Sequence, residues 1–582
     1  MDIKNGFKAM AYFLKRMPLL TILYFALNII TGLIPIATAL IIGRLVDRAI
    51  IIVREAQAIS AIIPYVILLI GVYMTDQIVP VLYDYLKKEL AIAVEDVTNK
   101  ELIAKHAKLS YWQLEDPESL NHIRLVSTNT TNKMLKFLDG FNGVLRGLVN
   151  IVSILITISI YIWWAVPVLI LFVIPLIWIV TRSSKKVYEQ EKSLQKTERV
   201  LDMYSEMMSS KDYYKERTLF GYTKSISSRF KKLTLEKFKL EFKLMIRVFA
   251  QIKLSAIAVT LVLLVMGYMI LRSTLHGNMS FGLFTSLFAM IFLLSQDIGW
   301  QFSGAIDSTV TGVEFFKDYF KFFEFEEEED SYLRENLSFN ELEFRDVHFT
   351  YPKTEREIIK GMSFKIKSGR HYALVGENGS GKSTVVKLML GLYDNYTGDI
   401  LIDGIDVKNM PLDKRRAYFS TIFQDYSIFA TSVKENILME NKEDRLNELI
   451  DELNLDFINK LPVGLDTEIG KLDERGADLS GGERQRIAIA RTLISPAPVI
   501  VMDEPTAAMD PITESNLYRN LSKVLSGKTT IFISHRLGST ALSDEILLFK
   551  DGKVHENGTH DELMELNGVY REMYDSQKEW YQ

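Results

Sequence analysis

The hydrophobic positions of this chain change their pattern partway along it. Up to about residue 300, apolar residues form long runs, each close to the roughly 20 residues that an α-helix needs to cross a bilayer. From about Leu337 the runs shorten to strand length and alternate with helical patterns, which predicts a soluble α/β domain. The six long runs, each a predicted membrane span, are Leu19–Gly43, Ile59–Val81, Phe141–Ile162, Ala165–Thr181, Phe249–Leu271 and Phe281–Trp300.

The segment before the first run, residues 1–18, mixes basic and apolar residues and ends in a proline. This pattern is typical of an amphipathic helix that lies at the inner membrane surface. A cleaved signal peptide is the alternative, but the apolar run that follows is too long for one. The basic residues of the segment are Lys4, Lys8, Lys15 and Arg16.

The loops between the predicted spans differ in length and charge. The loops after the second and fourth spans are long and rich in lysine, as in Arg182–Lys186 and Arg229–Lys232. Positive charge favours the cytoplasmic side of a membrane, so we expect both long loops and both chain ends to lie in the cytoplasm.

Each long loop has apolar residues every three or four positions, which predicts helices that extend beyond the membrane and turn back at a short segment. The first turn is expected near Asp116–Glu118, where Asp116 would cap a helix and Pro117 would take its first position. The second turn is expected within Ser210–Gly221. These tips either dock onto the α/β domain or stay solvated.

The segment Gly376–Ser383 reads G-E-N-G-S-G-K-S and fits the phosphate-binding pattern G-x-x-x-x-G-K-[ST]. It lies between a short apolar strand, His371–Val375, and a helical stretch, Thr384–Leu392. Glycines at three positions let the backbone approach a phosphate, and the free N–H groups of the following helix attract it. We therefore predict an ATP site, whose loop residues are Gly376, Glu377, Asn378, Gly379, Ser380, Gly381, Lys382, Ser383 and Thr384.

Two of these residues have a specific expected role. Lys382 would reach the β- and γ-phosphates, and the hydroxyl of Ser383 would ligate Mg²⁺. A further Mg²⁺ ligand is predicted at Asp503, which follows the buried apolar strand Pro498–Met502 and would act through water. The next residue, Glu504, is expected to orient or deprotonate the attacking water.

Two more motifs lie in the second half of the chain. The buried strand Thr529–Ser534 ends in His535, which is expected to contact the γ-phosphate. The segment Leu479–Glu483 precedes a predicted helix, Arg484–Leu493, and the hydroxyl of Ser480 and the N–H groups of Gly481 and Gly482 would bind a second anion. One nucleotide does not need two phosphate sites in one subunit, so we expect each motif to complete the site of a facing subunit.

Composition narrows the range of functions. The chain has 582 residues, 48% of them hydrophobic, a formal net charge of −5 and no cysteine. The charge gives no case for nucleic-acid binding. The lack of cysteine excludes disulfides, thiolate catalysis and cysteine metal sites, and with them a cysteine peptidase that would cleave a leader peptide.

Together and in this order, the motifs resemble those of ATP-binding cassette (ABC) exporter half-transporters, over essentially the full chain. The resemblance implies a six-helix membrane domain fused to an α/β P-loop NTPase cassette. It also implies a catalytic and Mg²⁺-binding role for Gln424, and adenine stacking on Tyr351. The D-loop Ala507–Asp510 and a segment Glu474–Gly476 that contacts the partner's loops complete the match.

The resemblance also implies how the chain would work. Two subunits with twelve membrane helices would hold two ATP molecules and Mg²⁺ between their cassettes, and closure of the cassettes would drive alternating access. The chain departs from the family at Glu483, where Gln is usual, and at Ala507 and Met509, where Ser and Leu are usual. An intact Glu504 favours a homodimer, with a heterodimer as the alternative.

The predicted domains are a surface helix (1–18), a membrane domain (19–321), an acidic solvated linker (322–336) and a nucleotide-binding domain (337–582). The expected location is a bacterial cytoplasmic membrane, in contact with lipid. A soluble cassette ATPase acting on nucleic acid is excluded by the six spans. An ATP-gated channel or regulator is disfavoured because Glu504 and His535 are intact.

The cargo is less well specified. The loop segments Tyr111–Arg124 and Lys215–Phe220 resemble those of exporters of bacterial peptides, which favours a peptide or another amphipathic substrate. A multidrug or lipid exporter is the alternative. Asp76, Gln296 and Asp297 either line a cavity for a cationic substrate or are solvated carboxylates and amides at helix ends.

Overall fold

The structure is a computed structural model. It describes residues 3–56, 58–160, 163, 165–276, 279–328, 333, 337–470, 476–504, 521, 524–525, 527–533 and 543–579. The chain forms two compact units. The first contains residues 1–107 and 115–326, and the second contains residues 108–114 and 327–582.

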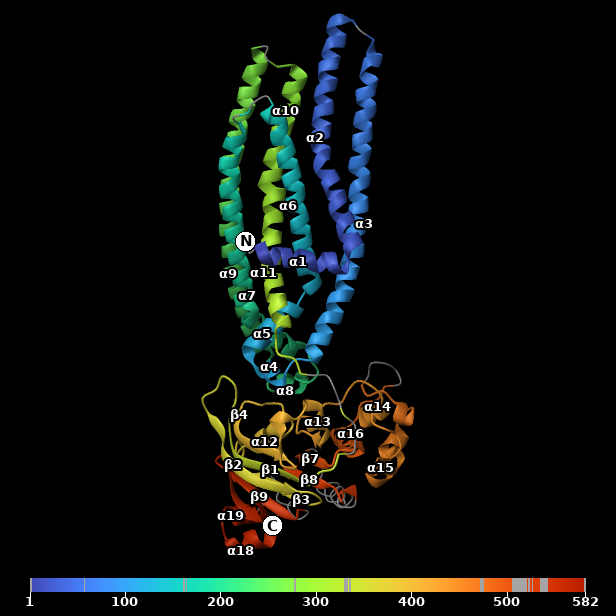
Figure 1. Ribbon diagram of the computed structural model, residues 1–582, viewed down its shortest axis with the longest axis vertical. Coiled ribbons are helices and arrows are strands. Elements are labelled where there is room, and N and C mark those ends of the chain that lie inside the picture. The colour runs from blue at the N-terminus through green and yellow to red at the C-terminus, as the bar shows by residue number, and fades with distance from the viewer. Residues whose placement is uncertain are drawn as a thin grey trace. The chain divides into compact units, whose positions relative to one another are not determined.

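The first unit is a bundle of long helices that run alongside one another (Figure 1). Its apolar core lies where α2, α6, α7, α9, α10 and α11 meet. The helices are α1 (Ile3–Arg16), α2 (Pro18–Glu55), α3 (Ile63–Ala107), α5 (Pro117–Ser127), α6 (Thr130–Ser159), α7 (Ala165–Ser209), α8 (Tyr214–Leu219), α9 (Thr223–Leu275), α10 (Phe281–Gln296) and α11 (Ser303–Phe323), with short turns η1 (Ile59–Ile62) and η2 (Asp297–Phe302).

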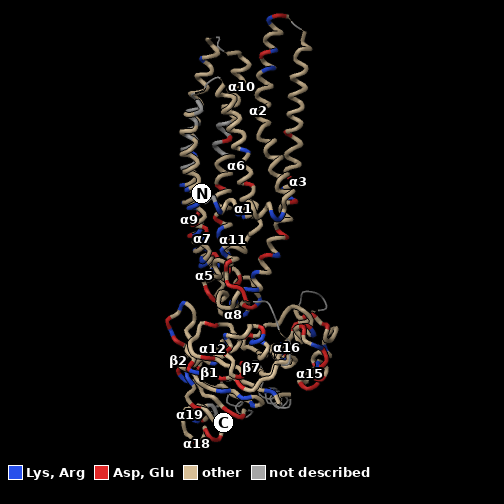
Figure 2. The backbone as a smooth tube through the Cα atoms, viewed as in Figure 1, with Lys and Arg blue, Asp and Glu red and all other residues tan. Residues whose placement is uncertain are grey.

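Three helical segments in the described part of the chain are long and apolar enough to cross a membrane: Pro18–Glu55, Ile59–Ala107 and Thr130–Ser159. Shorter apolar stretches occur at Leu263–Leu275 and Phe281–Leu293. Charge separates the two parts of α3, since Asp76 is the one charged residue before Asp84 and many charged residues follow (Figure 2). The prediction of six spans is thus supported for three, and the full count remains a prediction.

Small residues let α6 and α11 pack closely. A Cβ atom added at Gly140 would lie 2.5 Å from the backbone nitrogen of Thr309, and one at Gly312 would lie 2.3 Å from the Cβ of Phe137. Only glycine permits this approach, which is the usual way for helices to pack when apolar burial alone cannot hold them together.

Both predicted loop turns are confirmed. Asp116 caps α5, where its carboxylate accepts a hydrogen bond from the backbone N–H of Ser119 at 2.8 Å, and Pro117 is the first helical residue. In the second loop, α7 ends at Ser209 and α9 begins at Thr223, with only the short helix α8 between them. The predicted N-terminal helix is also present as α1, with its basic end at Lys15 and Arg16.

The sixth predicted span is interrupted by the π-helical turn η2, which begins at Asp297. The side chain of Asp297 is 6% exposed and accepts a hydrogen bond from Asn150 at 2.9 Å. The interpretation of Asp297 as a solvated carboxylate is therefore wrong, because the turn directs it against α6. Asp76 is exposed on α3, and the side chain of Gln296 lies outside the described residues.

The second unit contains two sheets (Figure 1). One is antiparallel, with the order β2-β1-β4-β5, and the other has the order β10-β9-β3-β8-β7-β6, parallel except for β10. The strands are β1 (Glu341–Thr350), β2 (Glu357–Lys367), β3 (His371–Gly376), β4 (Tyr396–Ile402), β5 (Ile405–Asp406), β6 (Phe419–Ile422), β7 (Val499–Asp503), β8 (Thr529–Ile533), β9 (Glu545–Lys550) and β10 (Lys553–Gly558).

The described helices of this unit pack around the sheets and connect their strands. Every residue of β7 and β8 is buried, as predicted from their continuous apolar runs. The helices are α4 (Tyr111–Glu115, which begins in this unit), α12 (Lys382–Met389), α13 (Leu412–Ala417), α14 (Val433–Leu438), α15 (Leu446–Glu452), α16 (Gly481–Ile494), α18 (His560–Leu566) and α19 (Val569–Glu579), with 3-10 turns η3 (Val407–Asn409), η4 (Asp456–Lys460) and η5 (Gly464–Asp466).

The acidic run that begins at Glu326 is not simply solvated. The carboxylate of Glu328 accepts a hydrogen bond from Arg416 at 2.7 Å and another from the backbone N–H of Tyr111 at 3.1 Å. Just before the run, Phe322 is a fully buried residue of α11. The interpretation of this segment as a solvated linker is therefore wrong at these two positions, because long-range partners bind them.

Candidate nucleotide site

The predicted phosphate loop connects β3 to α12, and its glycines have the backbone angles that the turn requires. Gly376 has a φ of +145°, and a Cβ there would lie 2.2 Å from the carbonyl oxygen of Phe549 on β9. Gly381, with a φ of +107°, is the N-cap of α12. Any other residue at these two positions would clash or be strained. The helix begins at Lys382 rather than at the predicted Thr384, because the loop turns directly into it.

The loop opens onto a cavity of about 290 Å³. This cavity brings together most of the residues predicted from the sequence, from four separate segments of the chain. The predicted residues that line it are Tyr351, Asn378, Gly379, Gly381, Lys382, Ser383, Thr384, Gln424, Asp503 and Glu504. Arg356, Ile358 and Ile533 also line it and were not predicted.

Three predicted loop residues, Gly376, Glu377 and Ser380, belong to the loop itself and not to the cavity lining. The hydroxyl of Ser380 is buried and has no hydrogen-bond partner among the described residues. Lys382 donates hydrogen bonds to the carbonyl oxygens of Gly376 at 2.8 Å and Glu377 at 3.0 Å. A lysine and an unpaired hydroxyl within one tight turn are donors, which fits a segment that binds an anion.

Burial changes the charge equilibrium of Lys382. Desolvation lowers the pKa of its ammonium, and the negative charges of Asp503 and Glu504 raise it in opposition. The side chain is 5% exposed. A buried ammonium of this kind gains from any further negative charge placed beside it, such as a phosphate.

The end of β7 meets the start of α12 at the predicted Mg²⁺ ligands. The hydroxyl of Ser383 donates a hydrogen bond to Asp503 at 3.3 Å. Burial raises the pKa of Asp503 to about 6; the charge of Glu504 adds to this, and Ser383 and Lys382 oppose it. A hydroxyl and a carboxylate are hard oxygen donors, so these residues fit Mg²⁺.

Glu504 follows β7 with a φ of +48°, an uncommon backbone conformation for a residue other than glycine. Its backbone N–H donates to the carbonyl oxygen of Ile533 on β8 at 3.0 Å, which supports this conformation. The side-chain amide of Gln424 donates to the carboxylate of Glu504 at 3.1 Å. Two of the residues predicted to be catalytic are thus in direct contact.

Tyr351 lies at another side of the cavity, where its hydroxyl and that of Thr384 form a hydrogen bond at 3.0 Å. Its ring packs edge-on against Phe349 and Tyr393, at centroid distances of 4.9 Å and 5.3 Å. The ammonium of Lys387 lies 5.6 Å from the ring centroid. These neighbours hold the ring in place, which suits the predicted stacking on a base.

The second predicted anion site does not share this cavity within one chain. Ser480 is the N-cap of α16, which begins at Gly481 rather than at the predicted Arg484. The Ser480 hydroxyl donates to the carboxylate of Glu483 at 2.8 Å and accepts from its backbone N–H at 3.3 Å. This is a capping box, which explains the earlier helix start. Gly482 is the next residue of the helix, and a Cβ there would meet open space.

Several predicted positions lie outside the described residues. These are the His535 position after β8, the D-loop Ala507–Asp510, and Glu474 and Arg475 of the segment before the signature motif. Their predicted roles remain predictions.

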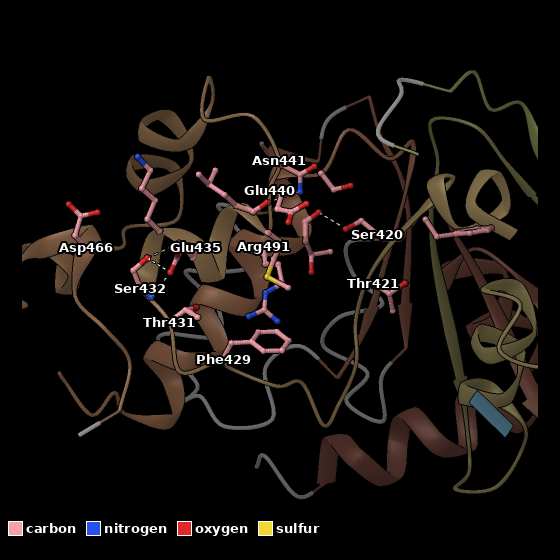
Figure 3. A pocket seen from close by; sticks show the side chains of 16 residues that line it. Ser420, Thr421, Phe429, Thr431, Ser432, Glu435, Glu440, Asn441, Asp466 and Arg491 are labelled. Atoms are coloured by element: carbon pink, nitrogen blue, oxygen red, sulfur yellow. Dashed lines mark hydrogen bonds between the residues drawn. The ribbon is translucent and has the colours of Figure 1, made fainter. Parts of the chain in front are cut away.

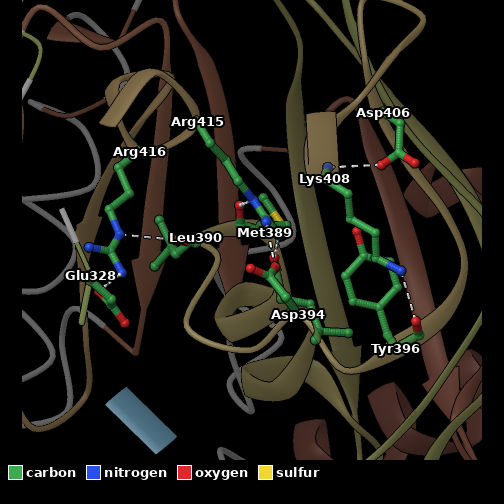
Figure 4. Close-up of polar contacts among 10 residues, drawn as sticks. Glu328, Met389, Leu390, Asp394, Tyr396, Asp406, Lys408, Arg415 and Arg416 are labelled. Atoms are coloured by element: carbon green, nitrogen blue, oxygen red, sulfur yellow. Dashed lines mark hydrogen bonds and ion pairs between the residues drawn. The ribbon is translucent and has the colours of Figure 1, made fainter. Parts of the chain in front are cut away.

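A buried arginine that was not predicted from the sequence binds the C-terminal end of α12 (Figure 4). The guanidinium of Arg415 donates to the carbonyl oxygens of Leu388 and Met389, the latter at 3.0 Å, and to the carboxylate of Asp394 at 2.7 Å. Its side chain is 2% exposed. The last carbonyls of a helix have no partner within the helix, so Arg415 satisfies those of the phosphate-loop helix.

A larger cavity, of about 1000 Å³, lies between β6, α14 and α16 (Figure 3). Phe429 and Met439 line it and are 47% and 39% exposed. Behind them, Arg491 donates to the carbonyl oxygens of Ser427 and Asn436, both at 2.8 Å. The cavity therefore combines accessible apolar side chains with charged ones, Lys434, Glu435, Glu440 and Asp466.

Comparison with known proteins points to one group. Residues 359–507 match the ABC transporter family model. The chain is 32% identical over 432 residues to the ATP-dependent lipid A-core flippase of Salmonella typhimurium LT2, covering 72% of both chains. It is 25% identical over 603 residues to the subtilin transport ATP-binding protein SpaT of Bacillus subtilis, covering 99% of this chain and 97% of that one.

Two further comparisons complete this picture. The chain is 37% identical over 308 residues to an ATP-dependent lipid A-core flippase of Pseudomonas fluorescens Pf-5, but the match spans half of that relative's length. A solved structure of a bacterial Atm1-family ABC exporter with ATP bound has the same fold, with a TM-score of 0.74 and 24% identity over 97% of this chain and 98% of that one.

Proposed function

Because this chain belongs to the ABC exporters, we propose that it uses ATP hydrolysis to move a peptide or another amphipathic molecule out across a bacterial cytoplasmic membrane. The observation that carries this proposal is the 290 Å³ cavity, where Lys382, Ser383, Asp503 and Glu504 line one space. Each of these residues has a distinct part in phosphoryl transfer, and the four come from two segments far apart in the sequence.

The chain's own groups account for the steps of hydrolysis. Lys382 and the backbone N–H groups at the start of α12 hold the phosphates. Ser383, Asp503 and Gln424 would hold Mg²⁺, which when bound offsets negative charge on the phosphates. Glu504 orients the attacking water and accepts its proton, and its contact with Gln424 keeps the carboxylate in place.

We propose that a second copy of the chain completes each site. Ser480, Gly481 and Gly482 form a helix N-terminus that does not share the cavity of their own chain, so they are available to a nucleotide held by a partner. A homodimer is favoured because Asp503 and Glu504 are both present, and a heterodimer is the alternative. The long helices α2, α3, α6, α7, α9 and α10–α11 would supply six spans per chain.

The loop helices would connect ATP binding to the membrane helices. In α8, Leu219 and the following Phe220 are 79% and 75% exposed, which is costly for apolar side chains unless a partner covers them. The 1000 Å³ cavity has the accessible apolar side chains of Phe429 and Met439 in its lining, and we propose that it receives α8 of the second copy.

The likeness to the subtilin transport protein over nearly the full chain favours a peptide cargo. The higher identity to lipid A-core flippases supports a lipid or multidrug cargo as the second candidate.

The first test is ATPase activity of the wild type and Glu504→Gln in lipid nanodiscs, titrated with cationic peptides and with hydrophobic drugs. We expect stimulation by peptides in the wild type and a loss of at least 100-fold in the variant, since the base is removed. Glu448→Gln, an exposed substitution on α15, is the control and should keep full activity.

The outcomes separate the candidates. Stimulation by drugs or lipids alone would select the second candidate. An ATP-gated ion current without stimulated hydrolysis would contradict an exporter. An inactive wild type that is restored by a second, different subunit would replace the homodimer with a heterodimer.

A further inference from the structure

A cavity of about 870 Å³ opens between α7, α9 and α11 in the first unit. Its volume is within the range of 300–1,000 Å³ that accommodates a drug-sized ligand. One side is apolar, formed by Phe238, Phe242, Met245 and Phe249 of α9. These four residues follow one another at spacings of four, three and four, so they share one face of the helix.

This apolar face is exposed rather than packed. Phe238, Phe242, Met245 and Phe249 are 60%, 51%, 67% and 51% exposed. Large apolar side chains grouped in this way usually mark a binding surface. A gap left by imperfect helix packing would instead have its apolar side chains turned inward.

The polar side of the cavity is acidic. It carries Glu191, Glu198, Glu241 and Asp307 and a single ammonium, that of Lys253. Two of the carboxylates already have a partner, because Lys237 lies 2.6 Å from Glu198 and 3.6 Å from Glu241.

The other two carboxylates, those of Glu191 on α7 and Asp307 on α11, accept no side-chain hydrogen bond and form no ion pair with any described residue. They belong to different helices but line the same space as the aromatic face. A cavity that combines unpaired carboxylates with aromatic rings is complementary to a cation with an apolar body.

Charge favours a cation as the occupant of this face. A cation would neutralise its carboxylates, whereas a second copy of the same face would bring more carboxylates than ammonium groups to the contact. The place of the cavity agrees with cargo entry, because Phe249 begins a predicted span and, apart from Lys253, the rest of the lining on α9 precedes it.

We propose that this cavity binds the cargo, and that the cargo is a cationic amphiphile whose positive charge lies near Glu191 and Asp307 and whose apolar part lies against the aromatic face of α9. The inference rests on the proposed export function and adds to it the substrate class and the site. Asp297, which is committed to Asn150, has no part in it.

The test uses two probes of the same size and shape with opposite charge, tetraphenylphosphonium and tetraphenylborate. Binding to the full-length protein in nanodiscs, without nucleotide, is measured by equilibrium dialysis against nanodiscs that contain no protein. We expect the cation to bind and the double variant Glu191→Gln, Asp307→Asn to bind it at least ten-fold more weakly. The anion should bind no better to the wild type than to the double variant.

Two further variants keep the result interpretable. Glu189→Gln removes an exposed carboxylate two residues from Glu191 that does not line the cavity, so cation binding should be unchanged. Phe242→Ala keeps every charge but shortens the aromatic face, and we expect binding to fall several-fold. The basal ATPase rate and the thermal unfolding midpoint confirm that each variant is folded.

Equal binding of the cation to the wild type and the double variant would overturn the proposal. A double variant that binds the cation normally but no longer forms a dimer would also overturn it, because the face would then be a contact between subunits. Equilibrium dialysis measures binding without ATP hydrolysis. The hypothesis of a cation site and the hypothesis of ATP-driven export can therefore be contradicted independently. A protein that binds the cation at this cavity but has no stimulated ATPase would contradict the export function alone.

Discussion

The charge state of Asp503 depends strongly on its surroundings in the nucleotide site. Burial against β7 and α12 raises its pKa to about 6 from an ordinary 3.8. The folded chain therefore binds a proton at Asp503 more readily than the unfolded chain does. The stability that this proton provides is present below about pH 4 and is lost as the pH rises through 6.

The first prediction is a pH dependence in the absence of Mg²⁺. Between pH 4 and 7 the wild type should lose roughly 2 kcal/mol of stability from this group, since one pKa unit corresponds to about 1.4 kcal/mol and part of the effect is already lost at pH 4. Thermal unfolding midpoints in EDTA, compared with those of Asp503→Asn, measure the difference. Parallel pH profiles for the two proteins would contradict the assignment.

The raised pKa of Asp503 also predicts how the affinity for Mg²⁺ depends on pH. Mg²⁺ requires the carboxylate form, so the affinity for Mg²⁺ should fall as the pH is lowered through about 6. Titration of Mg²⁺ at fixed ATP, from pH 5 to 8, should show a slope for the wild type that Asp503→Asn lacks.

Glu483 is a second residue with a measurable effect. Glu483 is the third residue of α16, and its carboxylate accepts a hydrogen bond from the backbone N–H of Ser480 in the capping box. The same carboxylate places negative charge where a partner's phosphate is proposed to bind. Glu483→Gln keeps the cap and removes the charge, so we expect the KM for ATP to fall about two- to five-fold. Glu483→Ala, which loses the cap as well, is the control, and an unchanged KM in the glutamine variant would contradict the charge effect.

Among the elements, α12 depends on a residue far from it in sequence. Arg415 satisfies carbonyl oxygens at the C-terminal end of this helix, whose N-terminal end forms the phosphate loop. Arg415→Met would leave the carbonyl oxygen of Met389 without its donor, remove one donor from that of Leu388 and break the pair with Asp394, and leaving a buried group unsatisfied typically costs about 1–3 kcal/mol. We expect the unfolding midpoint of the cassette to fall by roughly 10 °C.

The matched control is Arg445→Met, because the ion pairs that Arg445 forms with described residues, Glu448 and Glu452, are exposed or half-buried. Such pairs contribute under about 1 kcal/mol, so the midpoint should move little. Equal shifts in the two variants would show that Arg415 does not support α12.

For the whole molecule, the sequence predicted those parts that local signals encode. The glycines of the phosphate loop, the buried strands β7 and β8, and the cap at Asp116 each depend on a few neighbouring residues, and all are present. Asp503 was assigned to the site because it follows a buried apolar strand in a chain with a phosphate loop, whereas Gln424 was assigned only by the family resemblance.

The parts that were missed depend on contacts between distant segments. Arg356 lies in the loop between β1 and β2, and only the fold of this loop brings it to the nucleotide cavity. Glu328 is one of five consecutive acidic residues in the sequence, and only its contacts with Arg416 and Tyr111 distinguish it from the others. The start of α16 was predicted at Arg484 but lies at Gly481. The prediction compared Glu483 with the residue usual in the family and did not consider that Glu483 can form a capping box with Ser480.

The length of α9 has a mechanical consequence. It is a single helix of 53 residues with no internal proline, whereas α2, α3 and α7 each contain one, at Pro35, Pro80 and Pro175. At 1.5 Å per residue it is a rod about 80 Å long, so a tilt of about 10° at one end displaces the other by about 14 Å. With no hinge residue of that kind to absorb the rotation, α9 would act as a lever that converts a small angular change into a large linear one.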